Sequence, residues 1–354
     1  MKRVLSFDDV ETAVLGGAIL GGGGGGLIEP GLATARHALA SGAVELWSVD
    51  EFAPDVLAAT VALVGAPAAP DPQMAPADML ATIRGLEQTL PAGQTLAAIN
   101  TNENGSQTTI NGWFHAAMSQ LPVLDLACNG RAHPTGSMGA LGLHREEGYV
   151  SRQAYAGGRG ARRVSGVATG SLQAAAGVVR QASIEAGGLV AVARNPVSVE
   201  YAATHGAPGA ISAAITLGER YLAGGVDAAV AHLGGSVVTR ARVRVADLEQ
   251  RSGLDVGRIE LEDGTDLGVV NEYMTLNQRG ARIADFPDLI MTFTEEGPIP
   301  SAHVRAGMAI TVVHVPADRL LLSRTMFMPE LYDGVVELLG EEFGPRPAAQ
   351  EPAA

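Results

Sequence analysis

The first half of the chain alternates between short apolar runs and segments whose apolar residues recur at helical spacing. Each apolar run has the length of a buried strand, and each intervening segment has the length of a helix. Strands that alternate with helices are typical of a largely parallel sheet covered on both faces. The predicted strands are Val44–Trp47, Thr60–Gly65, Leu96–Ile99 and Pro122–Leu126, and the predicted helices cover residues 9–20, 30–41, 77–90 and 110–120.

The pattern changes after Gly170, where two further helical segments come first and strand character then dominates from Val226 to Leu276. Within that stretch, Val237–Val245 alternates apolar and charged residues with a period of two, which is typical of a strand with one solvated face. Turn dipeptides such as Asp263-Gly264 divide the rest into short strands. The predicted helices of this half cover residues 171–186, 210–223 and 329–339, and a strand is predicted at 189–193.

These two patterns predict two domains. We expect an α/β N-terminal domain with a mostly parallel sheet at residues 1–168, and a β-rich C-terminal domain with two early helices at 169–343. The Pro/Ala-rich tail at 344–354 is predicted to be disordered. A chain of 354 residues with 47% hydrophobic residues is long enough and apolar enough to bury a large core.

The net charge of −14 argues against a nucleic-acid-binding surface. The densest basic cluster is Arg159–Arg163, which is short. No apolar run reaches the length of a membrane span, and acidic residues follow the N-terminus before any long apolar region, unlike a signal peptide. We therefore expect a cytoplasmic protein whose partners are a small-molecule substrate and further copies of the chain in a homo-oligomer, with no nucleic acid and no membrane.

Two residue types are nearly absent, and this excludes several mechanisms. Lys2 is the only lysine, so a P-loop lysine or a Schiff-base lysine would have to lie at the extreme N-terminus. Cys128 is the only cysteine, so the chain forms neither an intrachain disulfide nor a Cys-rich metal site. The eight histidines are scattered without zinc-binding spacing. No cofactor is identifiable from the sequence, although a divalent metal held by distant residues stays open.

Six consecutive glycines, Gly21–Gly26, follow the helix predicted at 9–20. Glycine lets the backbone adopt conformations closed to other residues and leaves its N–H groups uncovered. One interpretation is a loop that approaches a ligand closely, and the other is a flexible linker or tight packing between helices. A dinucleotide-binding loop would follow a strand, so a phosphate site is not favoured. The residues predicted to line a ligand pocket are Gly22, Gly23, Gly24 and Gly25.

Polar clusters follow two neighbouring predicted strands, at Asn100–Gln107 and at Asp125–Pro134. Ligands gather at the carboxyl ends of strands in open α/β sheets. Glu103 is therefore a candidate base or ligand. The predicted substrate contacts in these clusters are Asn104, Ser106 and Asn129.

Asp125 ends an apolar strand and needs a partner if it is buried, and Arg131 is the natural candidate. The pair is either part of a catalytic site or a buried ion pair that holds the loop. Cys128 lies beside Arg131 and His133, whose charges can lower a thiol pKa and create a nucleophile. The alternative is that Cys128 is a small buried hydrophobic residue. His133 is the histidine that we expect to be functional.

A second pair of polar residues lies at the end of an apolar strand in the C-terminal half. Asn271 and Glu272 are interpreted either as substrate-binding residues or as part of a turn. Asp288 follows a proline and precedes another apolar run, a position typical of a turn.

Taken in order, several of these segments resemble the DUF917 proteins, described as the S-methyl thiohydantoin desulfurase family. The resemblance covers about residues 8 to 340 and implies an α/β domain followed by a β-rich domain, acting on five-membered cyclic imide-like rings. Ala127 and Thr135 stand where family members usually carry acidic residues, which indicates a divergent member. The segments that carry it are Gly16–Gly26, Glu103–Ser106, Leu121–Asp125, Gly130–Pro134, Asn271–Glu272, Pro287–Ile290 and Arg305–Gly307.

Three functional hypotheses follow from the residues and the resemblance. The first is a hydrolase of a thiohydantoin or hydantoin type ring, with water attack on a ring carbon and Glu103 or Asp125 as the carboxylate base. Arg131 would bind a substrate carboxylate or carbonyl in this hypothesis. The second is a metal-dependent hydrolase or lyase of related rings. The third is a non-catalytic small-molecule-binding protein of the same fold.

Overall fold

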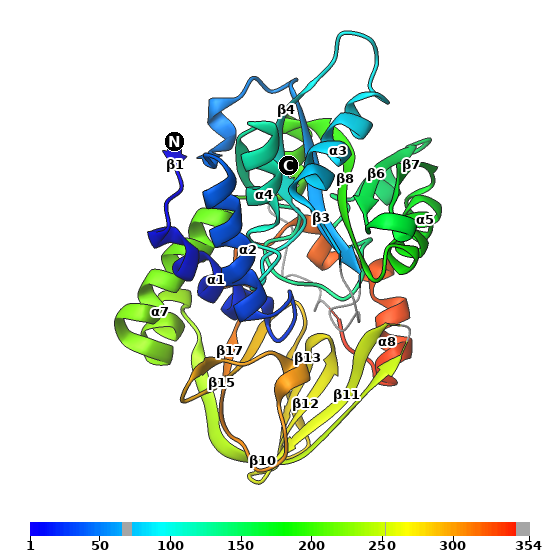
Figure 1. Ribbon diagram of the computed structural model, residues 1–354. Helices are drawn as coiled ribbons and strands as arrows, with labels where there is room; N and C mark the ends of the chain where they lie inside the picture. Colours follow the sequence, from blue (N-terminus) through cyan, green and yellow to red (C-terminus); the bar gives the residue numbers. More distant parts are fainter. Residues whose placement is uncertain (66–72, 252, 345–354) are drawn as a thin grey trace.

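The computed structural model describes residues 1–65, 73–251 and 253–344. The first sheet is mixed and has nine strands. Its order is β1-β2-β5-β4-β3-β8-β6-β7, and β9 pairs with β5 (Figure 1). Neighbouring strands among β2, β5, β4 and β3 are parallel, and the remaining pairs are antiparallel. The strands are β1 (Lys2–Val4), β2 (Glu45–Trp47), β3 (Leu57–Gly65), β4 (Leu96–Thr101), β5 (Val123–Ala127), β6 (Ser151–Gly157), β7 (Val164–Gly170), β8 (Leu189–Ser198) and β9 (Ala207–Pro208).

Helices pack against this sheet, and one core lies between the sheet and helices that include α1, α2 and α4. Trp113 fills the centre of that core with a fully buried indole ring. Helices α1 and α7 approach so closely that a Cβ on Gly16 or Gly218 would meet the backbone of the other helix within 3.0 Å. The helices are α1 (Asp8–Gly21), α2 (Ile28–Ser41), α3 (Pro76–Glu87), α4 (Asn111–Ser119), α5 (Leu172–Glu185), α6 (Val199–His205), α7 (Ala210–Leu233) and α8 (Asp333–Leu339).

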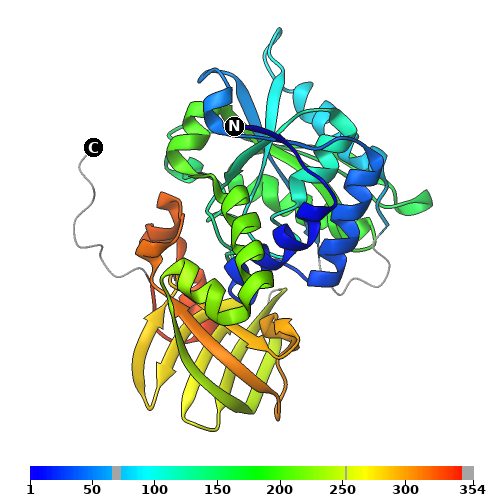
Figure 2. The same ribbon diagram turned by 90° about the vertical axis from the view of Figure 1, so that its left-hand side faces the viewer.

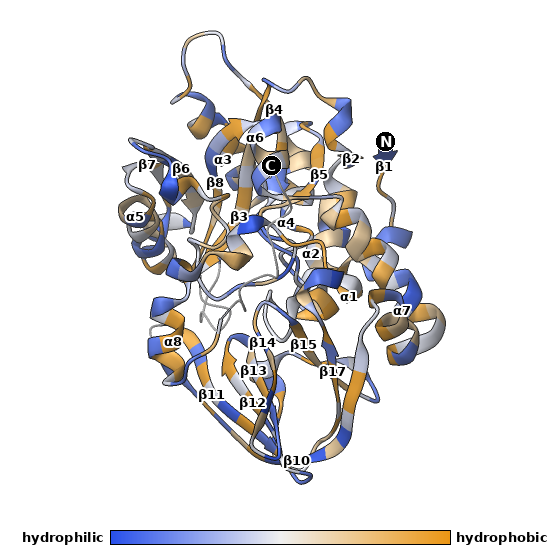
Figure 3. Ribbon diagram, turned by 180° about the vertical axis from the view of Figure 1, so that it is seen from behind, coloured by the Kyte–Doolittle hydropathy of each residue, from blue (hydrophilic) through white to orange (hydrophobic). Residues whose placement is uncertain are grey.

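The second sheet is fully antiparallel, with eight strands in the order β14-β13-β12-β11-β10-β17-β15-β16. Figure 2 shows this sheet as a separate layer, with α7 running between it and the α/β part. Bands of hydrophobic and hydrophilic residues alternate along β11 in Figure 3. The strands are β10 (Ser236–Arg251), β11 (Leu254–Leu261), β12 (Thr265–Val270), β13 (Glu272–Gln278), β14 (Ala281–Asp285), β15 (Leu289–Thr294), β16 (Gly297–Pro298) and β17 (Ala309–Val315).

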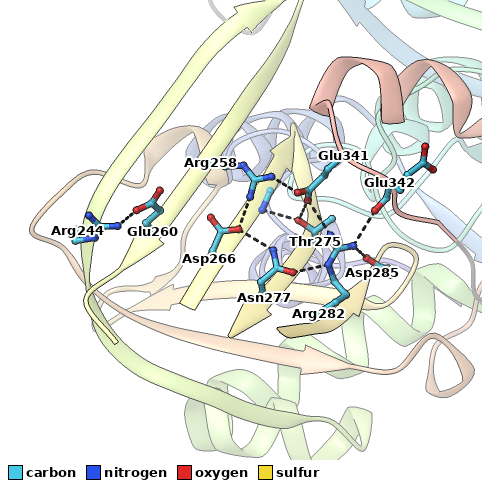
Figure 4. A network of polar contacts seen from close by, with 11 residues as sticks. Arg244, Arg258, Glu260, Asp266, Thr275, Asn277, Arg282, Asp285, Glu341 and Glu342 are labelled. Carbon is cyan, nitrogen blue, oxygen red and sulfur yellow. Dashed lines mark hydrogen bonds and ion pairs between the residues drawn. The ribbon is translucent and has the colours of Figure 1, made fainter. Parts of the chain in front are cut away.

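A group of polar residues ties the chain after α8 to the second sheet (Figure 4). We call it the sheet network, and its members are Arg258, Asp266, Asn277, Arg282 and Glu341. Glu341 pairs with both arginines and accepts a hydrogen bond from Thr275.

The predicted fold class, an α/β N-terminal domain and a β-rich C-terminal domain, is confirmed, and the parallel part of the first sheet comprises β2, β5, β4 and β3. One local prediction is wrong: α7 continues to Leu233, where strand character was expected from Val226. A break at Gly224–Gly225, whose backbone angles are non-helical, hides this continuation from a periodicity argument.

The first sheet continues past the domain boundary predicted after residue 168, which falls inside β7. The division into domains therefore stays a prediction. The predicted tail lies outside the described residues from 345 onward. Among the helices of the described ranges, none combines the length and apolar character needed to cross a bilayer.

Candidate functional site

The glycine loop joins the two sheets. Helix α1 ends at Gly21, and Gly22 takes a left-handed conformation with φ 56° at the helix C-cap. The carbonyl of Gly22 accepts a hydrogen bond of 2.8 Å from the amide of Tyr273, and that of Gly23 accepts one of 3.0 Å from the amide of Ser301. Gly25 accepts one of 2.9 Å from the amide of Gln107. The loop after α1 in Figure 1 therefore bonds to the loop after β4 and to the second sheet.

Side chains have no room in this loop. A Cβ on Gly22 would lie closer than 3.0 Å to Nη2 of Arg131, and a Cβ on Gly24 would lie closer than 3.0 Å to the carboxyl group of Glu272. The glycines are required because the backbone packs directly against these two charged residues. Their predicted contact with a ligand stays a prediction.

Four titratable residues meet beside the glycine loop, and we call them the junction cluster: Glu103, Arg131, His133 and Glu272. They come from the loops after β4 and β5 and from the first residue of β13. All four are at most 8% exposed. Because these side chains are buried, their hydrogen bonds and neighbouring charges determine their protonation states and their chemistry.

Arg131 is fully buried and donates through Nη1 to the carbonyls of Pro287 and Asp288. Its guanidinium carbon lies 4.6 Å from the ring centroid of Phe286. Burial lowers the pKa of Arg131 to about 10, while the charge of Glu272 opposes that shift. Nε and Nη2 have no hydrogen-bond partner within the described part of the chain. Arg131 therefore bonds to the second domain and keeps two donors unpaired.

The two carboxyl groups of the junction cluster have opposite environments. Oε2 of Glu103 has a partner, because it lies 2.6 Å from Nδ1 of His133. Burial raises the pKa of Glu272 well above its usual value, and the nearby charge of Glu103 raises it further. Oε2 of Glu272 has no hydrogen-bond partner among the residues described. The structure thus favours a neutral Glu272 close to a Glu103 that is paired with His133.

His133 is held in one orientation by Asn129. With its amide oxygen turned toward Nδ1 of His133, Asn129 donates to the carbonyls of Asn102 at 3.1 Å and Arg131 at 2.9 Å. Nδ1 of His133 then faces two acceptors, the amide of Asn129 and the carboxylate of Glu103, so it carries a proton. Asn129, predicted as a substrate contact, has this positioning role in the structure.

The predicted pairing of Asp125 with Arg131 is wrong. Oδ1 of Asp125 accepts hydrogen bonds of 3.0 Å from the amides of Ile211 and Ser212, in the first turn of α7. The free N–H groups at a helix N-terminus are strong partners for a buried carboxylate. Asp125 therefore caps the N-terminus of α7 through Oδ1.

Cys128 fits the second of its two interpretations, a small buried residue, and not that of a nucleophile with a lowered thiol pKa. Its sulfur lies 3.3 Å from Oγ1 of Thr60 and 3.3 Å from Nδ2 of Asn100. Burial raises the pKa of the thiol, so the neutral form is favoured. A neutral buried thiol is a poor nucleophile.

Three other predicted site residues shape the loops. Asn104 donates to the carbonyls of Gly130 and Ala210 and so ties the two strand-end loops to α7. Ser106 is buried, at 1% exposure. Asn271, with φ 56°, accepts a hydrogen bond of 2.9 Å from the amide of Asp255 and thus sets the backbone that presents Glu272. Their contact with a substrate stays a prediction.

Sequence reasoning missed Arg194, a half-buried residue of β8 whose charge acts on Glu103 and Cys128. A signal was present, since Arg194 directly follows the apolar run predicted as a strand at 189–193. This position after an apolar strand is the same signal that indicated Glu103.

The described residues contain no group of three or more His, Cys, Asp or Glu side chains arranged to hold a metal ion. Two surface pockets are lined by none of the four junction-cluster residues. One lies beside α8, between Tyr332 and Phe343, and the other lies between Leu143 and Tyr201.

Comparisons with known proteins cover nearly the whole chain. A family model described as "S-Me-THD-like, N-terminal domain" matches residues 8–164, and one described as "S-Me-THD-like, C-terminal domain" matches residues 171–327. A search of curated proteins finds no significant match.

One similar solved structure is an X-ray structure of a protein from Chromobacterium violaceum, determined by the Northeast Structural Genomics Consortium. Its TM-score is 0.72 at 22% sequence identity, over 95% of this chain and 97% of that one. At this identity the likeness shows that the two chains share a fold.

Proposed function

This chain belongs to the S-methyl thiohydantoin desulfurase (DUF917) family, and we propose that it hydrolyses a small cyclic imide-like ring of the thiohydantoin or hydantoin type. Membership of the family indicates an enzyme of hydantoin-related compounds. The observation that carries the finer proposal is the contact between Glu103 and His133 close to Glu272, whose carboxyl oxygen Oε2 has no partner among the described residues.

Two carboxyl groups with different protonation states can act as base and acid in one reaction. Glu103, paired with His133, is the base that activates water, and Glu272 is the acid. Asp125 is not retained as the base, because the amides of α7 occupy its carboxylate. Arg131 does not bind the substrate directly in this proposal. It positions Glu272 and the glycine loop.

The reaction on an S-methyl thiohydantoin begins when a water oxygen bonds to the ring carbon that carries sulfur. Glu103 takes a proton from that water, while Glu272 gives its proton to the ring nitrogen. The carbon–sulfur bond then breaks, Glu103 returns its proton to the sulfur, and methanethiol leaves. Glu272 recovers a proton from the ring hydroxyl group as the carbonyl forms. Both residues end in their starting states, and the ring product is a hydantoin.

The substitution Glu103→Gln tests this proposal because it removes the base and keeps the size of the side chain. On a panel of S-methyl thiohydantoins and hydantoins, methanethiol release and ring opening are measured together with thermal stability. We expect turnover of the accepted ring to fall by about 10²- to 10⁴-fold with the fold intact. Glu147→Gln, at an exposed position with the same change of charge, is the control and should keep wild-type turnover.

Full turnover in Glu103→Gln would remove Glu103 from the mechanism. Turnover that is lost after chelation and restored by an added divalent metal would instead support the metal-dependent hypothesis. Binding of a ring without turnover of any member of the panel would support a non-catalytic protein of this fold.

A further inference from the structure

Four polar side chains form a row across the first sheet, and we call them the polar row: Asn100, Thr60, Arg194 and Gln153. Thr60 of β3 pairs with Asn100 of β4 and with Arg194 of β8, and Arg194 pairs with Gln153 of β6. Directly paired residues point to the same face of a sheet. Nδ2 of Asn100 donates to Oγ1 of Thr60 at 3.3 Å. The row therefore places one arginine among amide and hydroxyl groups on one face of the sheet.

The strand that carries Arg194 has a β-bulge directly after it. Ala58 pairs with Val197 and Thr60 pairs with Arg194, so Asn195 and Pro196 together oppose a single residue of β3. Asn195 has φ 51°, an uncommon conformation for a residue other than glycine. A bulge of this kind bends its strand and re-aims a side chain, and it is common beside active sites.

Asn195 is fixed by its own hydrogen bond, and this stabilises the bulge. Its Oδ1 accepts a hydrogen bond of 2.7 Å from Oγ of Ser151 on the neighbouring strand. Ser151 and Gln153 also bond to each other, at 3.1 Å. Hydrogen bonds from β6 therefore hold the backbone beside Arg194.

Three members of the polar row have buried atoms without partners. They are Nε of Arg194, Oδ1 of Asn100 and Oε1 of Gln153, none of which has a hydrogen-bond partner in residues 1–65, 73–251 and 253–344. Buried polar atoms are almost always paired in folded proteins. The unpaired donor of Arg194 would pair with an anionic group of a ligand, and the two unpaired acceptors would pair with N–H groups of the same ligand.

The charges around the row also favour an anion. Arg131 and Arg194 are two buried or half-buried cations. Glu103, the proposed base, is the carboxyl group whose charge acts on Arg194, whereas burial favours the neutral form of Glu272. A ligand carboxylate would balance the remaining positive charge. Arg131 is the less open of the two arginines, because its Nη1 is bonded to main-chain carbonyls and the backbone of Gly22 packs against its unpaired Nη2.

We propose that Arg194 binds a carboxylate group carried by the ring substrate, while Gln153 and Asn100 accept hydrogen bonds from its N–H groups. This inference rests on the proposed function, because it specifies a carboxylated ring as the substrate of the same site. Asn100 lies at the end of β4 and Glu103 follows in the loop after that strand, so this subsite lies close to the proposed base. The planar guanidinium matches a carboxylate with two parallel hydrogen bonds.

The test uses two matched ligands, hydantoin-5-acetate and its neutral amide, with calorimetric measurement of Kd. Wild-type protein should bind the carboxylate about 10- to 100-fold more tightly than the amide. Arg194→Gln should abolish this preference and leave the Kd of the amide within about twofold. Arg220→Gln, an exposed arginine on α7, is the control and should keep the wild-type preference.

A preference retained in Arg194→Gln, equal binding of the two ligands by wild type, or no binding of either would overturn the proposal. If circular dichroism shows that Arg194→Gln is unfolded, the two ligands are compared in Arg194→Lys instead. This variant keeps the positive charge but cannot form two parallel hydrogen bonds with a carboxylate. The expected result is a preference reduced by about 10-fold, and an unchanged preference would contradict the proposal.

This binding test and the proposed hydrolysis can fail separately. Hydantoin-5-acetate needs no turnover to bind. An Arg194-dependent preference in a protein that hydrolyses no S-methyl thiohydantoin would retain the subsite and reject the reaction.

Discussion

Charged residues gather in two regions of this protein, the sheet network of the second domain and the junction cluster between the domains. In the sheet network every arginine and carboxylate has partners (Figure 4). Arg258 bonds to Asp266 at 2.6 Å and pairs with Glu341, and Arg282 donates to Asn277 at 2.7 Å. These side chains remain partly exposed, so water completes their solvation.

The junction cluster differs in both respects. Its residues are buried, yet Arg131 retains two unpaired nitrogens and Glu272 one unpaired oxygen among the described residues. A buried polar atom without a partner costs about 1–3 kcal/mol. The difference teaches that paired, partly exposed charges contribute to stability, whereas buried polar atoms without partners lower it and need another reason to persist. We infer that this reason is the reaction.

The largest expected effect is that of Glu272→Gln on turnover. Replacing the proposed acid should lower turnover by about 10²- to 10⁴-fold. The free energy of unfolding at pH 7 should stay the same or rise, because a neutral amide replaces an ionisable group whose charge the fold disfavours.

The pH dependence of unfolding sharpens the same prediction. The pKa of Glu272 is raised in the folded state, so its contribution to stability is present at low pH and is lost as pH rises through the folded pKa. The unfolded chain loses the proton first as pH rises above 4.5, so urea unfolding at pH 5 and pH 7 should show this loss in wild type and a smaller loss in Glu272→Gln. Full turnover in the variant would break the comparison.

Gly24→Ala tests the close packing of the glycine loop on the junction cluster. The added methyl group would overlap the carboxyl group of Glu272, and we expect destabilisation of about 3 kcal/mol in urea unfolding. Gly136→Ala is the matched control, since a Cβ there meets nothing within 4 Å. Equal stability of the two variants would mean that the loop accommodates the methyl group without a loss of free energy of unfolding.

Glu341→Gln breaks the sheet network at the residue that joins both arginines. We expect it to lower the free energy of unfolding by about 1–2 kcal/mol and to leave turnover unchanged. Glu337→Gln, at an exposed position of α8, should change neither quantity. A loss of turnover in Glu341→Gln without loss of stability would assign the sheet network a functional role that we do not expect.

The smallest expected effect is on the pH dependence of unfolding and comes from His115, a buried residue outside both regions. Burial lowers its pKa to about 4, and its Nε2 has no hydrogen-bond partner in the part of the chain described. The unfolded chain therefore binds a proton before the folded protein does as pH falls from 6.5 toward 4, and stability declines in this window.

His115→Gln should reduce the stability difference between pH 7 and pH 5.5 by about 1 kcal/mol. His37→Gln, at an exposed position of α2, should leave that difference as in wild type. An unchanged difference in His115→Gln would show that His115 is not responsible.

The sequence predicted the alternation of strands and helices and the polar clusters after β4 and β5, because both depend on local periodicity and turn residues. It also identified Glu103, His133 and Glu272 as candidates and the family by the order of its segments. The partner of Asp125 was predicted incorrectly. That partner, the first turn of α7, lies more than eighty residues along the chain, and no local pattern announces such a contact.

The polar row was missed for a related reason. It exists because β8 and β6 add to the edge of β3 in antiparallel register, and because a bulge shifts that register beside Arg194. Neither the order of strands in a sheet nor a one-residue shift follows from periodicity. The kink in α7 at Gly224–Gly225 was likewise hidden, because glycines also mark turns between strands.

The central claim is that two neighbouring carboxyl groups have opposite protonation states at neutral pH. Infrared difference spectroscopy of wild type against Glu272→Gln at pH 7 tests it most directly, with Glu103→Gln as the second comparison. The account predicts that wild type shows the carbonyl absorption of one protonated carboxyl group, which Glu272→Gln lacks, and that Glu103→Gln loses a carboxylate absorption instead. A carboxylate absorption lost in Glu272→Gln would contradict the assignment of Glu272 as the acid.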